Sequence, residues 1–275
     1  RSQALIDLAK RTEINSLVID VKDASGYVSY PTQVLAAREV GADQEIRIPD
    51  LVDLVKRLHH ANIYPIARIV VVKDPLFIRG RPEVAVQDTS GGVWVDGKGL
   101  IWTTLHNRAV WEYNVELAKE VSGVGFPEIQ WDYVRFPDAP REDLDRAVFP
   151  GAEGRTRRDA VEAFLEYTQS ELAESGVEMT LDVFGATTSA TSDIGIGQYW
   201  ERFITSVDVA LPMVYPSHYW AGSFAIQDPN GHPYEIVHAA LQSGLKRSEA
   251  IEGAGTIRPW LQDFTLGLPM YGAPE

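Results

Sequence analysis

Apolar runs of strand length alternate with helical patterns along the chain. The runs lie at residues 16–21, 64–72, 128–134, 178–184 and 207–214, and a weaker one follows at 258–264. Near-continuous apolar runs are typical of strands buried on both faces of a parallel sheet. Between them, apolar residues recur at helical spacing, as Leu51, Leu54, Val55 and Leu58 do. This alternation predicts βαβ units and a parallel sheet.

Two α/β folds satisfy this pattern, a doubly wound sheet and a (β/α) barrel. No Gly-x-Gly-x-x-Gly follows the first run, and polar residues recur at the carboxyl end of nearly every predicted strand. A barrel keeps its active site at those ends, whereas a doubly wound fold concentrates it at one switch point. We therefore expect a (β/α)8 TIM-type barrel that forms a single domain over residues 1–275.

The predicted strands number about six, where a full barrel has about eight. The chain opens on a helical pattern, with apolar residues at 4, 5, 8 and 9, and ends in Pro269–Glu275. We therefore expect the first and last strands of the barrel to be absent from this chain, which leaves an open seam. Residues 73–106 form a long insertion after the second run, and its segments 84–88 and 93–96 predict a β-hairpin. Such a loop is typical of an active-site wall or lid.

Composition excludes several classes of function. The chain carries 25 Lys and Arg against 39 Asp and Glu, a net charge of −14, which disfavours nucleic acid as a partner. No apolar run reaches about 18 residues, so we expect no membrane insertion. The absence of cysteine excludes disulfides, thiolate catalysis and Cys-ligated zinc. The six histidines form no His-x-x-x-His pair, so we expect no protein-ligated metal and no cofactor.

Two aspartates end consecutive predicted strands, Asp132 in Glu128–Asp138 and Asp182 in Thr180–Gly185. A carboxylate in an apolar run is costly unless a cleft solvates it, a cation pairs with it or the protein uses it. A structural ion pair with Arg135 is the competing interpretation for Asp132. Two facing carboxyl groups supply the acid and the nucleophile or base of glycoside cleavage. We predict Asp132 as nucleophile or base and Asp182 as acid, and the close spacing of adjacent strands favours a retaining mechanism. An acid from a more distant strand, such as Asp263, is the alternative to Asp182.

Polar and aromatic residues near the other strand exits complete the predicted site. Aromatic faces stack on the C–H surface of a sugar ring, and charged groups bind its hydroxyls or tune the carboxylates. For His218, a loop histidine bonded to backbone is an equally good interpretation. The predicted substrate-binding residues are Asp20, Arg68, Arg135, Tyr215, His218, Trp260 and Asp263.

The sequence leaves two other functions open. A non-catalytic polysaccharide-binding barrel would need aromatic residues and hydrogen bonds, but no facing carboxyl groups of divergent pKa. A metal-dependent carbohydrate esterase is a weaker alternative, because no histidine pair lies near an aspartate.

Several segments resemble one known family in order along nearly the whole chain. They are Asn15–Gly26, Ala67–Pro75, Val110–Asn114, Glu128–Pro137, Met213–Tyr219 and Ile257–Phe264. They resemble the bacterial putative glycosyl hydrolase domain family, and the block Asp-Tyr-x-Arg-Phe-Pro is quite specific. The resemblance implies a glycosidase-type barrel, a carbohydrate substrate and an extracellular or cell-surface location, with any signal peptide outside this chain.

Overall fold

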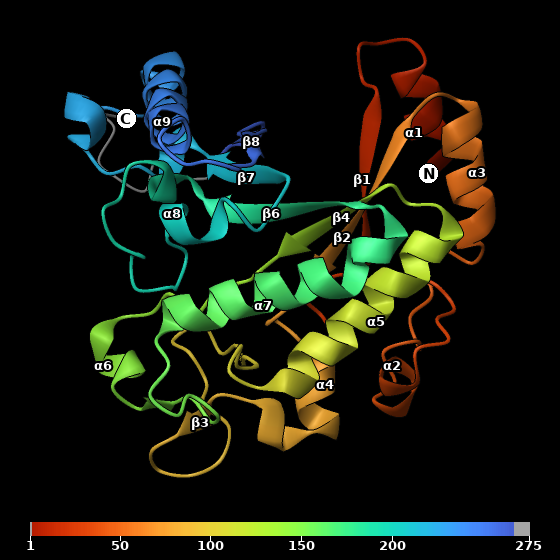
Figure 1. Ribbon diagram of the computed structural model, residues 1–275, viewed down its shortest axis with the longest axis horizontal. Helices are drawn as coiled ribbons and strands as arrows, with labels where there is room; N and C mark the ends of the chain where they lie inside the picture. The colour runs from red at the N-terminus through yellow and green to blue at the C-terminus, as the bar shows by residue number, and fades with distance from the viewer. Residues whose placement is uncertain (1, 267–275) are drawn as a thin grey trace.

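The computed structural model describes residues 2–266 and contains one large parallel sheet flanked by helices (Figure 1). The strands of this sheet are β1 (Ser16–Lys22), β2 (Tyr64–Val70), β4 (Glu128–Asp132), β6 (Glu178–Phe184), β7 (Val209–Val214), β8 (Thr256–Ile257) and β9 (Trp260–Leu261). The helices are α1 (Ser2–Ala9), α2 (Leu35–Glu39), α3 (Leu51–His60), α4 (Pro75–Gly80), α5 (Arg108–Val124), α6 (Arg141–Leu144), α7 (Arg157–Leu172), α8 (Trp200–Phe203) and α9 (Pro233–Ser248). A separate short ribbon pairs β3 (Gln87–Asp88) with β5 (Ala147–Val148).

The strands lie side by side in the order in which they occur along the chain. The order is β1-β2-β4-β6-β7-β8, and β9 also pairs with β7. All these pairs are parallel, as the apolar runs predicted. Sequential parallel strands joined through helices are the topology of a (β/α) barrel. Among residues 2–266, β1 does not pair with β8 or β9, so the barrel is open at the predicted seam.

All six predicted strands are present, although most of them begin or end a few residues away from the apolar runs. The run 128–134 stops as a strand at Asp132, because Tyr133 adopts a left-handed backbone conformation with φ 54°. The run 258–264 contains the short strand β9, whereas the equally short β8 precedes the run, and Arg258 and Pro259 separate the two strands. Proline has no backbone N–H to donate to the sheet, so the ladder is interrupted there.

The inner face of the sheet is strongly concave. Trp260 on β9 donates a hydrogen bond to Asp182 on β6, although β7 lies between these strands. Arg258, which follows β8, reaches Glu128 on β4 over two intervening strands. Side chains can meet across intervening strands only where the sheet curls, so the inner face has the curvature of a barrel.

Helices α3, α5, α7 and α9 pack on the outer face (Figure 1). Helices α3, α5 and α7 bury the apolar residues that their sequence patterns predicted, whereas α9 buries Ile236 and Ala240 and leaves Tyr234 exposed. Helix α7 begins with a capping box, in which Thr156 and Asp159 satisfy each other's backbone N–H groups. Trp131 points outward from β4 and packs edge to face on Phe164 of α7, with ring centroids 5.5 Å apart. Alternation along β4 therefore directs Glu128, Gln130 and Asp132 to the inner face.

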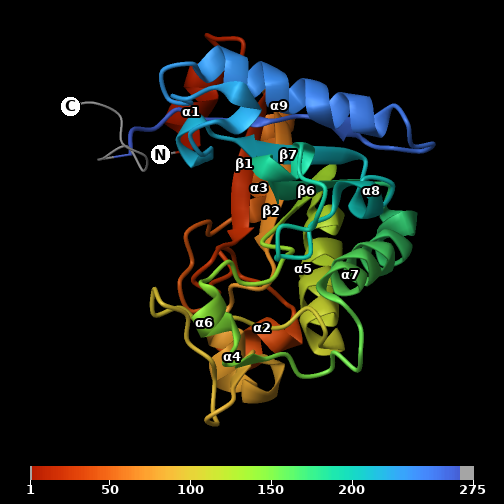
Figure 2. The same cartoon turned by 90° about the vertical axis from the view of Figure 1, so that its left-hand side faces the viewer.

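The long insertion after β2 lies beyond the carboxyl ends of the strands. Figure 2 shows β1 pointing towards the region that holds α2, α4 and α6. Within the insertion, antiparallel bridges join Gln87 to Val93, Val95 to Ile101 and Ala85 to Thr103. The insertion therefore contains short antiparallel segments joined by tight turns. It lies beside the end of the sheet at which barrels keep their active sites.

Candidate active site

One guanidinium, that of Arg68 on β2, joins three of the predicted aspartates. Its Nη1 donates a 2.5 Å hydrogen bond to Oδ1 of Asp20 on β1, and its Nη2 donates to Oδ2 of Asp132 on β4. Its Nε lies 3.7 Å from Oδ2 of Asp182 on β6. The side chains of Asp132 and Asp182 are only 8% and 3% exposed, whereas that of Asp20 is 52% exposed. The structure thus gathers Asp132 and Asp182 in one buried centre and places Asp20 at its rim.

Asp182 is held by two neutral donors as well as by its proximity to Arg68. The indole Nε1 of Trp260 donates to Oδ1 at 2.6 Å, and the amide of Gln130 donates to Oδ2 at 2.8 Å. Burial, together with the negative charge of Asp132, raises the pKa of Asp182 to about 8. The two hydrogen bonds and Arg68 oppose this shift without cancelling it. Asp182 therefore keeps its proton at neutral pH.

Asp132 is fixed by its own chain as well as by Arg68. Its Oδ1 accepts a 2.6 Å hydrogen bond from the backbone N–H of Tyr133. The left-handed backbone of Tyr133 is rare for a bulky residue, and such strain clusters at functional sites. Asp132 pairs with Arg68 and not with Arg135, whose Nη1 instead donates to the carbonyl of Phe136 at 3.0 Å. The competing interpretation, a structural pair of Asp132 with Arg135, does not match this geometry.

Every inward position of β4 is polar, which sequence reasoning did not use. Gln130 binds Asp182, and Glu128, fully buried, accepts hydrogen bonds from Thr180 and Arg258. The alternation Glu-x-Gln-x-Asp was the available signal, because period-two polar residues in a buried strand must share one face. A cavity of about 160 Å³ lies on this inner face, lined by Ser16, Val18, Ile66, Gln130, Leu211, Arg258, Pro259 and Trp260.

The remaining predicted residues lie at different distances from the carboxyl pair. Burial, and then the negative charges of Asp182 and Asp132, raise the pKa of the Tyr215 phenol. Tyr215 therefore lies close enough to the carboxyl pair to interact with its charge. The ring of His218 meets that of Tyr215 with centroids 5.4 Å apart, its Nδ1 lies 3.0 Å from Oγ of Ser217, and burial lowers its pKa. Asp263 is exposed and makes no hydrogen bond or ion pair with the described residues.

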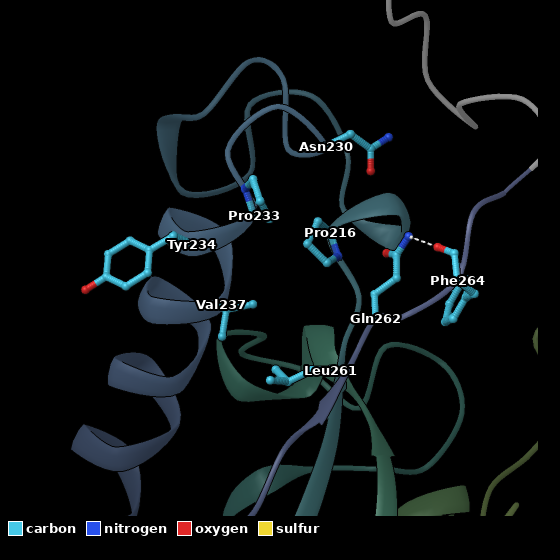
Figure 3. Close-up of a pocket in the computed structure, with 8 residues that line it drawn as sticks. All are labelled: Pro216, Asn230, Pro233, Tyr234, Val237, Leu261, Gln262 and Phe264. Carbon is cyan, nitrogen blue, oxygen red and sulfur yellow. Dashed lines mark hydrogen bonds between the residues drawn. The ribbon is translucent and has the colours of Figure 1, made fainter. Parts of the chain in front are cut away.

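A larger cavity, of about 390 Å³, lies elsewhere, between the start of α9 and the end of β9 (Figure 3). Its lining consists of Pro216, Asn230, Pro233, Tyr234, Val237, Leu261, Gln262 and Phe264. None of these residues is a carboxylate, a histidine or a lysine, so this cavity offers no acid–base pair. Within residues 2–266, no group of three potential metal ligands occurs either. The carboxyl pair is therefore the candidate catalytic centre.

Solved structures share this fold. A hypothetical protein from Ruminiclostridium thermocellum is 38% identical over 66% of this chain and 90% of its own, with a TM-score of 0.59. The PgaB (BpsB) glycoside hydrolase domain from Bordetella bronchiseptica is 14% identical over 90% of this chain and 76% of its own, with a TM-score of 0.59. A glycoside hydrolase family 20 β-N-acetylglucosaminidase is 13% identical over 94% of this chain and 60% of its own, with a TM-score of 0.55.

The two glycosidases confirm the fold, a glycosidase-type barrel that is not closed in this chain. Among curated proteins, no sequence matches the chain. In the described part of the chain, no helix combines the length and apolarity needed to cross a membrane. The family model described as "Putative glycosyl hydrolase domain" matches residues 1–274, and the chain belongs to that family.

Proposed function

We propose that this protein hydrolyses the glycosidic bond of a polysaccharide or oligosaccharide, with Asp182 as general acid and Asp132 as nucleophile or base. One observation carries the proposal. Asp182, whose pKa is raised to about 8, lies beside Asp132, which receives a hydrogen bond from Arg68. Environments that push two carboxyl groups apart in pKa assign the acid to one and the base or nucleophile to the other. Family membership and the barrel fold support the same reaction class.

The chemistry follows from these two protonation states. Protonated Asp182 gives its proton to the oxygen of the leaving sugar as the bond to the anomeric carbon breaks. In the retaining form of the reaction, the carboxylate of Asp132 bonds to that carbon and forms a glycosyl-enzyme ester. Water, deprotonated by Asp182, then displaces Asp132 and restores both groups. The guanidinium of Arg68 holds the side chain of Asp132 in position through its hydrogen bond.

The shared guanidinium supports the retaining form. Retaining enzymes hold their two carboxyl groups about 5–5.5 Å apart, and inverting enzymes about 6.5–9.5 Å apart. Asp132 and Asp182 lie on adjacent strands, and both contact the same planar cation. A pair on adjacent strands that shares one cation favours the shorter separation, which is the geometry of the retaining form.

The test is a hydrolysis screen on cell-wall and storage polysaccharides with matched variants. Wild-type protein is expected to release reducing ends from at least one polymer. Asp132→Asn is expected to lower that rate by about 10³-fold or more, because it removes the attacking group. Asp138→Asn makes the same change at an exposed residue six positions along the chain and is expected to leave the rate unchanged. Binding of a polymer without release of reducing ends would favour a non-catalytic binding barrel instead.

A further inference from the structure

Two half-buried cations stand at the carboxyl ends of the strands without a carboxylate partner. Lys73 follows β2, and Arg135 follows β4. Arg68 contacts three aspartates. In contrast, neither Lys73 nor Arg135 makes an ion pair with any carboxylate of residues 2–266. The only hydrogen bonds that their side chains make in that range lead to Tyr133 and to the carbonyl of Phe136.

Aromatic rings hold both cations in place. The guanidinium of Arg135 lies 4.9 Å from the ring centroids of Trp102 and Tyr133 and 4.7 Å from that of Phe184. The ammonium of Lys73 lies 5.0 Å from Trp102 and 4.6 Å from Tyr133. Trp102 itself is buried and anchored by its Nε1–H to a carboxylate in the insertion. The two cations therefore flank one rigid aromatic platform.

Burying positive charge without a counter-ion is unfavourable. Burial lowers the pKa of Arg135, and the carboxylates of Asp138 and Asp132 compensate only at longer range. The positive charge of Lys73 attracts the carboxylate of Asp96 only at longer range. Both oxygens of Asp96 accept hydrogen bonds from other groups, so Asp96 does not pair with Lys73. In a chain of net charge −14, an abundance of carboxylates was available to neutralise these two cations. Their isolation indicates that the missing anion comes with a ligand.

The platform adjoins the carboxyl pair. Tyr133 carries the backbone N–H that binds Asp132, and its ring contacts both cations. Phe184 lies two residues beyond Asp182 on β6 and therefore shares its inner face. An anion held between Lys73 and Arg135 would thus belong to the sugar at the cleavage point or to its neighbour.

We infer that the substrate is an acidic glycan, whose carboxylate or sulfate group is bound by Lys73 and Arg135. This inference rests on the proposed function for its placement beside the cleaved bond. Ammonium and guanidinium groups form charge-assisted hydrogen bonds with both kinds of anion. The acidic surface of the protein repels polyanions in general, so a preference for an acidic polymer would have to arise at a specific site.

The experiment compares polymers that differ only in their acid group. The carboxylate arm uses polygalacturonate, alginate and hyaluronan, each beside its carboxyl-reduced counterpart. The sulfate arm uses carrageenan and dextran sulfate, each beside its desulfated counterpart. Dissociation constants are measured on Asp132→Asn protein, which prevents cleavage, and hydrolysis is measured on protein with an intact Asp132. The arm that responds identifies the anion.

The variants isolate the charge of Lys73. Lys73→Met keeps an apolar stem against Trp102 and Tyr133 and is expected to weaken binding of the acidic polymer about ten- to a hundredfold. Lys73→Arg restores the charge and is expected to recover most of that loss. Lys56→Met, at an exposed position on α3, is expected to change nothing. Unchanged thermal unfolding of Lys73→Met shows that the loss is one of binding.

The inference is supported if an acidic polymer binds more tightly than its neutral counterpart and Lys73→Met reduces that preference about tenfold or more. It is overturned if no acidic polymer is preferred, if Lys73→Met leaves the preference unchanged, or if no polymer in either arm binds. Cleavage of a neutral polymer that Asp132→Asn abolishes and Lys73→Met does not affect would refute the inference and leave the proposed function standing. Lys73-dependent binding of an acidic polymer that is never cleaved would support the inference and refute the proposed function.

Discussion

Trp260 donates a 2.6 Å hydrogen bond from its indole Nε1 to Oδ1 of Asp182, across the strand that separates β9 from β6. The bond ties the last described strand of the open barrel to a carboxyl group that is only 3% exposed. A donor of this kind stabilises the ionised form and lowers the pKa, so Trp260 limits how far burial can raise the pKa of Asp182.

Replacing Trp260 by phenylalanine keeps an aromatic ring and removes this donor. The pKa of Asp182 is expected to rise by about one further unit, the equivalent of one lost hydrogen bond to a charged group. The alkaline limit of activity should move upward by the same amount. Gln130→Leu removes the other neutral donor and should act in the same direction. A downward shift in both variants would contradict the assigned role of these hydrogen bonds.

The pH dependence of kcat/KM reports the free enzyme's acid and base. Because Asp182 must be protonated to act as the acid, kcat/KM is expected to fall above a pH of about 8. Asp182→Asn should remove most of the activity and, in whatever rate remains, the alkaline limb. Initial rates measured from pH 5 to 10 provide the check, and an alkaline limb that persists in Asp182→Asn would assign it to another group.

The raised pKa of Asp182 also predicts how stability depends on pH. In the unfolded chain this group titrates near its ordinary value of 3.8, and in the folded protein near 8. Its contribution to stability is therefore fully present below a pH of about 4 and is lost as the pH rises towards 8. The asparagine side chain of the variant Asp182→Asn cannot ionise. As the pH rises from about 4 to about 8, the free energy of unfolding of the variant should therefore increase relative to that of the wild type. Urea unfolding at several pH values tests this, and parallel curves for the two proteins would count against it.

Arg68 is the cation that three carboxyl groups share, so its loss should be severe. Arg68→Met is expected to lower the free energy of unfolding by about 3–5 kcal/mol, because it leaves Asp132 buried without a cation. The loss should be smaller at a pH of about 5 than at 9, since protonation relieves the repulsion. Arg57→Met removes a solvent-exposed pair with Asp53 and should cost less than about 1 kcal/mol. Equal losses in the two variants would refute the buried-cation account.

Local patterns were sufficient to predict the strands of the large sheet, the longer helices and the open seam, but not the short helices α2, α4, α6 and α8. Asp132 and Asp182 were identifiable because carboxylates in apolar runs stand out, and their meeting follows from parallel neighbouring strands. The contacts of Arg68 and Trp260 depend on the curvature of the sheet, which no single segment encodes. Catalytic roles, retention of configuration and an extracytoplasmic location stay predictions.

The cation platform was harder to predict. Its parts come from the insertion, from β6 and from the loops after β2 and β4, and their assembly depends on the turn that Tyr133 makes with its left-handed backbone. Bulky residues rarely adopt the left-handed conformation, so the sequence does not indicate that Tyr133 would do so. Arg135 was predicted to bind substrate, whereas Lys73 was not among the predicted site residues.

The central claim is that burial and the neighbouring Asp132 keep Asp182 protonated at neutral pH. Carboxyl ¹³C NMR of aspartate-labelled protein, titrated from pH 3 to 10, measures this without knowledge of the substrate. The account predicts one aspartate resonance that titrates at a pH of about 8, disappears in Asp182→Asn and moves to lower pH in Asp132→Asn. A wild-type spectrum in which every aspartate carboxyl is ionised by a pH of about 5 would contradict it.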